Sequence, residues 1–133
     1  MTEYTKRHAQ AGLQAKLPPL LCWPNQYPGY EVTIEIPEFT SVCPRTTLPD
    51  FGLIRISYVP KKWCVELKSL KLYIHGFRDV GIFQENAVNR ILADFAAAVK
   101  PSQAVVRGEF TPRGGIKTVI EAHYPKRRVS CFV

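Results

Sequence analysis

The segment that begins with residues 66–73 and continues to Glu85 separates into two stripes when its residues are placed on a helix. Apolar residues recur at the three-to-four spacing of one helical face, and this set comprises Leu67, Leu70, Ile74 and Phe77. Basic residues repeat the same spacing one position later, and this set comprises Lys68, Lys71, His75 and Arg78. The pattern predicts a helix from about Leu67 to Phe77 that packs its apolar side on a core. Pattern alone favours a solvated basic face over an anion site.

A second helix is predicted from the apolar spacing of Val88, Ile91, Leu92, Phe95 and Val99. The alanine-rich stretch 96–98 favours a helix, and Pro101 ends it.

Four strands are predicted around these helices. Residues 30–36 alternate strictly between apolar and polar side chains, and Pro37 is expected to end that strand. Residues 51–59 form the second strand, after a loop over residues 40–50. Residues 104–111 and 116–124 form a hairpin, whose turn carries the paired glycines that tight hairpins need. A short extended piece is expected at residues 63–65.

The order strand, strand, helix, helix, strand, strand predicts an α+β fold. Its antiparallel four-stranded sheet would carry both helices on one face. Such a sheet has two open edges, which proteins must protect. We expect several subunits to associate into one continuous barrel.

Residues 1–29 are predicted to form an N-terminal arm, and residues 30–133 a single domain. The arm contains Pro18, Pro19, Pro24 and Pro28, a density that disfavours both regular helix and central strand. Its apolar residues Leu20, Leu21 and Trp23 are expected to pack on this subunit or on a neighbour.

The composition narrows the class of protein. The 133 residues are 46% hydrophobic, which is enough for one core, and no apolar run is long enough to span a membrane. The first residues are polar, unlike a signal peptide, so a soluble cytosolic protein is expected. The net charge of +7 suggests an anionic partner: nucleic acid, a nucleotide cofactor or an acidic protein. Basic residues are dispersed apart from positions 126–128, which weakens the case for a nucleic-acid tail.

The cysteines and histidines do not have the spacing of a metal site or a disulfide framework. Four free thiols are therefore expected: Cys22, Cys43, Cys64 and Cys131. Cys43 lies in a proline-bounded loop beside Arg45 and seven residues before Asp50, which suits a reactive thiolate. A buried structural cysteine is the alternative, and composition favours it.

Three further residues have two interpretations each. Glu85 near a helix start is either a helix-dipole partner or a carboxylate that accepts hydrogen bonds from an amino-purine edge, and Glu66 has a similar ambiguity. Arg113 in the hairpin turn is either solvated or an anion contact. Neither a Gly-x-Gly-x-x-Gly nor a Walker pattern occurs, so any nucleotide site is of another type.

Three motifs together resemble one enzyme family, the NADPH-dependent 7-cyano-7-deazaguanine reductases. Residues 43–50, CPRTTLPD, resemble its nucleophile loop. Residues 66–73, ELKSLKLY, resemble its NADPH motif at every position, and Phe77, Arg78, Phe83 and Glu85 follow at the family spacing. Residues 112–115, PRGG, resemble its late hairpin. The likeness extends from about Tyr27 to Tyr124.

The resemblance implies a tunnelling fold, with pentamers stacked into a decamer and active sites between subunits. It implies reduction of a nitrile to an amine with two NADPH, in queuosine modification of tRNA. Cys43 would form a thioimide and Asp50 would supply a proton. Substrate contacts would come from Glu85, Glu66 and Gln84. Cofactor contacts would come from Lys68, Ser69, Lys71 and Arg113.

The sequence departs from the family at two places. Gln84 stands where relatives commonly have His, and Gln cannot shuttle a proton. Thr47 and Leu48 stand where many relatives have Gly and Gln. Two alternatives remain: the related tRNA amidinotransferase of archaeosine synthesis, expected to lack the NADPH motif, and a tRNA-binding module without catalysis, suggested only by charge.

Overall fold

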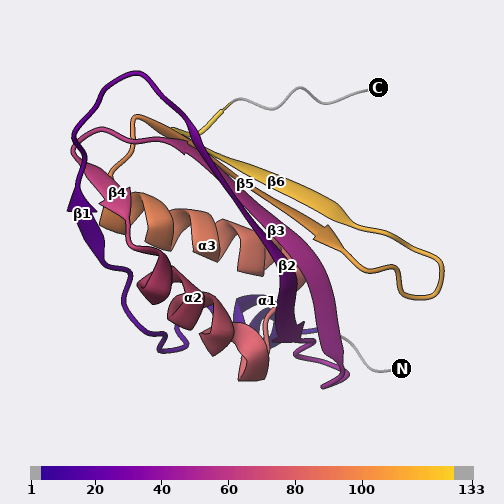
Figure 1. Cartoon of the computed structure of the whole chain (residues 1–133). Helices are drawn as coiled ribbons and strands as arrows, with labels where there is room; N and C mark the ends of the chain where they lie inside the picture. The colour runs from indigo at the N-terminus through magenta and orange to yellow at the C-terminus, as the bar shows by residue number, and fades with distance from the viewer. Residues whose placement is uncertain (1–3, 128–133) are drawn as a thin grey trace.

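The computed structural model describes residues 4–127 as a sheet covered on one face by helices (Figure 1). Its helices are α1 (Lys6–Gln10), α2 (Leu67–His75), the 3-10 helix η1 (Gly76–Asp79) and α3 (Gln84–Val99). Its strands are β1 (Cys22–Pro24), β2 (Val32–Val42), β3 (Pro49–Val59), β4 (Trp63–Val65), β5 (Gln103–Phe110) and β6 (Val119–Tyr124).

The main sheet has the order β2-β3-β5-β6, and every neighbouring pair is antiparallel. Both α2 and α3 lie on the same face of it (Figure 1). The predicted α+β architecture is therefore confirmed. The core between the two layers includes Ile54, Ile56, Phe77, Ile91 and Phe95, each fully buried.

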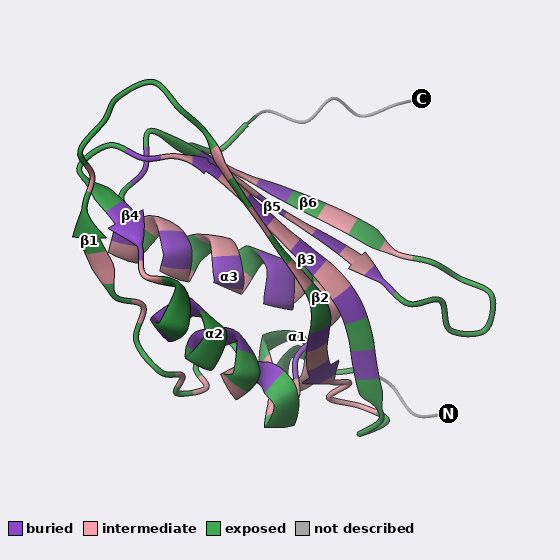
Figure 2. Ribbon diagram, viewed as in Figure 1, coloured by how far each residue is buried: buried purple, intermediate pink, exposed green. Residues whose placement is uncertain are grey.

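Buried and half-buried side chains alternate along β3, so one face of the sheet covers the core. Ile54, Ile56 and Tyr58 are buried under the helices, whereas Arg55 and Ser57 between them are half-buried and face the other side. Buried bands accordingly alternate with less buried ones along β3 (Figure 2). That other face carries ion pairs across strands, such as Arg55 with Glu35 at 2.6 Å. In the described chain β6 pairs along one edge only, and β2 does so apart from a bridge between Val42 and Gly81 at its end. Closure of the sheet into a barrel by other subunits stays a prediction.

The expectation that Pro37 ends the first strand is wrong. β2 continues to Val42, and its register with β3 shifts between Ile36 and Phe39. Proline lacks a backbone N–H, but an edge strand with a bulge tolerates it. The longer strand shortens the predicted loop, because β3 already begins at Pro49.

The amphipathic helix forms as α2 and η1 together. Leu70, Ile74 and Phe77 are buried, as the apolar stripe predicts, but Leu67 is 62% exposed. The regular α-helix ends at His75, and Phe77 lies in the 3-10 turn. The predicted stripe is thus correct for three of its four members.

The second helix and the hairpin agree well with their patterns. α3 ends before Lys100, which has a left-handed φ of 51°, and Pro101 follows. In the hairpin, Gly114 and Gly115 have φ values of 58° and 81°, between reciprocal backbone hydrogen bonds of Arg113 and Ile116. Positive φ at both central positions explains the glycine pair. β6 begins at Val119, three residues later than expected.

The N-terminal arm contains one element that its prolines did not predict. The short helix α1 precedes the first proline, so the expectation of no helix in residues 1–29 is wrong. The arm then pairs β1 with β4. Arg90 of α3 donates to the carbonyl oxygens of Gly12 (2.6 Å) and Ala15, which fixes the arm on the helix layer. The domain boundary after residue 29 stays a prediction.

Of the three apolar arm residues, one packs on the core. Leu20 contacts it, whereas Leu21 and Trp23 are 56% and 48% exposed. Cys22, Cys43 and Cys64 are free thiols, and Cys131 and Arg128 lie outside the described residues. Among residues 4–127, no helix has the length and apolar character required to cross a membrane.

Candidate active site

The loop between β2 and β3 places Cys43 and Asp50 at the same end of the sheet. Cys43 N–H donates to the Leu48 carbonyl at 2.9 Å, and Thr47 N–H donates to the Cys43 carbonyl at 2.9 Å. These two bonds close the loop tightly, so the residue after β2 returns beside the start of β3. The Asp50 carboxylate raises the pKa of the Cys43 thiol, so the two side chains lie within range of each other's charge.

The loop stabilises the thiolate form of Cys43. Partial burial raises the pKa of the thiol, but hydrogen bonds from the Thr46 hydroxyl and from the N–H groups of Thr46 and Arg45 lower it. The net pKa of Cys43 lies below its usual value despite the repulsion from Asp50. A thiolate is the nucleophilic form of cysteine, so this loop favours covalent chemistry.

Asp50 is the opposite case, a carboxyl group that keeps its proton more readily than usual. Its residue is only 6% exposed, and burial raises the pKa of the carboxyl group above its usual range. The Arg113 guanidinium and a hydrogen bond from Gln84 oppose that shift, and Glu85 adds to it. A carboxyl group that holds its proton more readily than usual is suited to act as a proton donor beside a thiolate.

Arg113 reaches the site from the β5–β6 hairpin. Its Nη1 lies 3.1 Å from Asp50 Oδ1, and its Nη2 donates to the Pro49 carbonyl at 2.8 Å. The carboxylate is buried while the arginine side chain is 45% exposed. The guanidinium therefore faces both the acid and the solvent, where an anion can approach it.

Gln84 and Glu85 are the first residues of α3, and a short parallel bridge places them near Cys43. Val42 N–H donates to the Val80 carbonyl at 3.0 Å, and Ile82 N–H donates to the Val42 carbonyl at 2.8 Å. The segment before α3 is thus fixed to the end of β2. The structure brings together five of the predicted residues: Cys43, Asp50, Gln84, Glu85 and Arg113.

The predicted residues at the start of α2, Glu66, Lys68 and Ser69, lie at the far end of the sheet. Val65 N–H donates to Tyr58 Oη at 3.1 Å, so Glu66 begins α2 near Tyr58. Tyr58 follows Asp50 by eight positions in β3, which corresponds to roughly 26 Å. Within one chain, Glu66 and Lys68 therefore do not reach Cys43.

Glu66 and Ser69 also make internal contacts. The Glu66 carboxylate accepts from the N–H groups of Lys68 (2.7 Å) and Ser69 (2.8 Å), which lowers its pKa and caps α2. The buried Ser69 hydroxyl donates to the Glu66 carbonyl at 2.8 Å and accepts from Leu21 N–H at 2.9 Å. These bonds fix the start of α2 and attach the arm to it.

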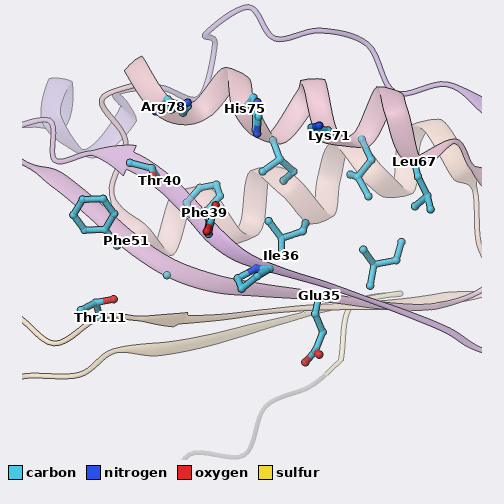
Figure 3. A pocket seen from close by; sticks show the side chains of 16 residues that line it. Glu35, Ile36, Phe39, Thr40, Phe51, Leu67, Lys71, His75, Arg78 and Thr111 are labelled. Atoms are coloured by element: carbon cyan, nitrogen blue, oxygen red, sulfur yellow. The ribbon is translucent and has the colours of Figure 1, made fainter.

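A groove of about 690 Å³ lies between α2 and β2 (Figure 3). Lys71, His75 and Arg78 line its helical side, with Ile36 and Phe39 among the apolar residues opposite. The basic stripe is therefore not simply a solvated face, because three of its four members border a cavity. Lys68 does not line it.

Two residues of the site were not singled out by sequence patterns. Thr47 has a φ of 61°, a left-handed conformation that is rare for a β-branched residue. The sequence did offer a signal of this strained conformation, because many relatives have Gly where this chain has Thr47. Ser41 is fully buried, and its hydroxyl has no hydrogen-bond partner among the described residues. An unpaired buried hydroxyl costs about 1–3 kcal/mol, and no sequence pattern marks it.

Comparison with known proteins identifies the class to which this fold and site belong. The family described as "QueF-like protein" matches residues 49–129. A protein of Elusimicrobium minutum is 58% identical over 93% of this chain and 95% of its own length, and one of Chloroherpeton thalassium is 57% identical over 75% and 88%. Both are named NADPH-dependent 7-cyano-7-deazaguanine reductase. The chain belongs to this QueF-like family.

A solved structure supports the fold assignment independently. The apo form of an archaeosine synthase QueF-Like superposes with a TM-score of 0.66, covering 70% of this chain and 91% of that one. The two sequences are 22% identical, so this likeness concerns the fold alone. It confirms the expected tunnelling-fold topology of the single chain.

Proposed function

We propose that this chain reduces the nitrile of 7-cyano-7-deazaguanine to the aminomethyl group of 7-aminomethyl-7-deazaguanine, with NADPH as the reductant. One observation carries the proposal beyond the family relationship. Cys43, with a lowered thiol pKa, lies in the same site as Asp50, whose carboxyl pKa is raised. Addition to a nitrile needs both a nucleophile for the carbon and a proton for the nitrogen.

In the first step, the Cys43 sulfur forms a bond to the nitrile carbon. The carbon–nitrogen triple bond becomes a double bond, and Asp50 gives its proton to the nitrogen. The product is a thioimide on Cys43, and Asp50 is left as a carboxylate paired with Arg113 at 3.1 Å. That ion pair stabilises the charge which the proton transfer leaves behind.

NADPH supplies two hydride ions, one for each two-electron reduction. After the first reduction the carbon–sulfur bond breaks, so Cys43 regains its thiolate and an imine remains. In the second reduction a hydride adds to the imine carbon and Asp50 gives a proton to the nitrogen, which yields the amine. Asp50 must therefore be reprotonated after the first step.

Recognition of the deazaguanine ring is assigned to the start of α3. Glu85 is exposed there, and its carboxylate suits the N–H groups of an amino-purine edge. Gln84 hydrogen-bonds to Asp50 and positions the acid, but it cannot relay a proton as the His of relatives would. Asp50 therefore carries the proton transfer in this chain. Glu66 is proposed as a second ring contact, contributed by another copy.

The groove beside α2 fits the phosphates of a dinucleotide. Lys71, His75 and Arg78 offer positive or protonatable groups along one side, and the apolar residues opposite suit a ring. We assign cofactor phosphates to Lys71 in this groove, to Lys68 one turn earlier and to Arg113 of the site. Ser69 supports them by fixing the start of α2.

The separation of these groups supports an active site shared between subunits. Asp50 and Tyr58 lie roughly 26 Å apart along β3, and Glu66 and Lys68 begin α2 near Tyr58, so we assign them to the site of a second chain. The unpaired edges of β2 and β6 are the surfaces through which copies can join into one sheet. We propose a decamer of two pentamers, acting in the cytoplasm in queuosine synthesis.

Spectrophotometry of NADPH tests the function. The purified chain should oxidise NADPH only when 7-cyano-7-deazaguanine is present, and C43A should not. C22S is the matched control, because Cys22 is a half-buried thiol of the arm, and it should retain the activity. Absence of nitrile-dependent oxidation by the unmodified chain would refute the proposal.

A further inference from the structure

Ser41 and Asp50 face each other across the β2–β3 ladder. They are register partners in an antiparallel pair, so their side chains project from the same face of the sheet. Ser41 is fully buried and Asp50 is 6% exposed. Directly opposed residues have Cβ atoms about 4.5–5.5 Å apart, a separation that a hydroxyl and a carboxylate can bridge.

Ser41 is exceptional among the buried polar side chains. In residues 4–127 these are Ser41, Asp50 and Ser69. The Ser69 hydroxyl makes two hydrogen bonds, and Asp50 pairs with Arg113, but the Ser41 hydroxyl has no partner. Folded proteins rarely leave a buried hydroxyl unpaired, and such a group calls for an explanation.

We propose that Ser41 is a positioning residue whose hydroxyl donates a hydrogen bond to the Asp50 carboxylate formed when the nitrile is protonated. This inference rests on the proposed function. Asp50 loses its proton in a place from which water is largely excluded, and its Oδ1 already accepts from Arg113. Rotation of the Ser41 side chain about its Cα–Cβ bond brings a further donor from the opposite strand, beside those from Arg113 and Gln84. The bond forms only after proton transfer, which favours the products of that step.

The charged groups around Asp50 do not make this donor redundant. Arg113 of the hairpin stabilises the carboxylate, whereas Glu85 of α3 and the Cys43 thiolate of the loop repel it. Gln84 adds one neutral hydrogen bond. A serine hydroxyl stabilises the charged form without adding net charge, so it does not weaken the proton donor in the way that a second cation would.

The test compares S41A with S41T, which retains the hydroxyl. S41A should lower kcat about tenfold, the loss expected for one hydrogen bond to a charged group, with KM for the nitrile unchanged. The acidic limb of its pH–rate profile should move to higher pH, because the Asp50 carboxylate loses a donor. S41T should restore both. In a D50N background, S41A should cause no further loss, since the hydroxyl acts through Asp50.

Thermal unfolding separates this role from a structural one. S41A should melt at the same temperature as the unmodified chain or higher, because it removes an unpaired buried hydroxyl. Wild-type kcat and pH profile in S41A would overturn the inference, and so would a lower melting temperature, which would mean that the hydroxyl already has a partner. Absence of nitrile reduction by the unmodified chain would instead refute the proposed function.

Discussion

The Arg113 guanidinium lies 3.1 Å from the Asp50 carboxylate, although 63 positions separate the two residues in the sequence. The contact joins the β5–β6 hairpin to the start of β3. It has two consequences: it holds down the pKa of a carboxyl group that burial raises, and it places a cation at the edge of the site. The family resemblance assigned Arg113 to a cofactor phosphate, and its exposed side remains available for one.

The protonation states of Cys43 and Asp50 predict how the rate of thioimide formation depends on pH. Thioimide formation needs one proton shared between Cys43 and Asp50. At low pH both groups are protonated and no base accepts the thiol proton. At high pH both are ionised and no acid remains. The profile should therefore be bell-shaped, with an acidic limb above the usual pKa of Asp and a basic limb below that of Cys.

R113Q should move the acidic limb to higher pH. Loss of the guanidinium removes the group that favours the charged form of Asp50, so the pKa of the carboxyl group rises further. R107Q is the control, because Arg107 pairs with Glu121 on the outer face of the sheet at 3.4 Å. An unchanged acidic limb in R113Q would show that Asp50 does not set it.

Thr47 predicts a stabilising substitution. Its φ of 61° is costly for a β-branched side chain and ordinary for glycine. T47G should raise the free energy of unfolding by about 1 kcal/mol, or the melting temperature by about 3–5 °C. T33G, in the extended β2 strand, is the matched control and should lower it. A melting temperature that falls in T47G would contradict the strain assigned to this loop.

The groove predicts a separation of cofactor binding from covalent chemistry. K71A should raise KM for NADPH about tenfold, because it removes one charged contact to a phosphate. Formation of the Cys43 adduct without NADPH should remain within about twofold of wild type, since that step uses no cofactor. K61A, a turn lysine that does not line the groove, is the control. Equal losses in both assays would remove the groove from cofactor binding.

Regular patterning predicted most of the fold, and its failures have physical causes. The alternation of apolar residues in β3 and their helical spacing in α3 predicted both elements correctly, because each element packs one face on the core. The prediction that Pro37 ends β2 was wrong because the strand lies at the sheet edge and carries a bulge, where a missing backbone N–H costs little. The short helix α1 escaped the apolar patterns because it buries no residue of its own, and Asn86 of α3 holds it by donating to the Ala9 carbonyl at 2.7 Å.

The sequence predicted which residues belong to the candidate site, but it did not predict how they are arranged in space. Motif likeness selected Cys43, Asp50 and Arg113, yet only the folded chain joins the last two. It also selected Glu66 with Cys43, but the single chain places them near opposite ends of β3, whose span from Asp50 to Tyr58 is roughly 26 Å. Ser41 escaped notice because an unpaired hydroxyl is a property of its surroundings rather than of a sequence pattern.

Intact-protein mass spectrometry tests the central claim most directly. The chain incubated with 7-cyano-7-deazaguanine and no NADPH should gain the mass of one substrate molecule, and peptide mapping should place it on Cys43. Added NADPH should remove that mass and release the amine, while C43A should gain nothing. A wild-type chain that gains no mass, or that carries the substrate on Cys22 or Cys64, would contradict the assignment of Cys43 as the nucleophile.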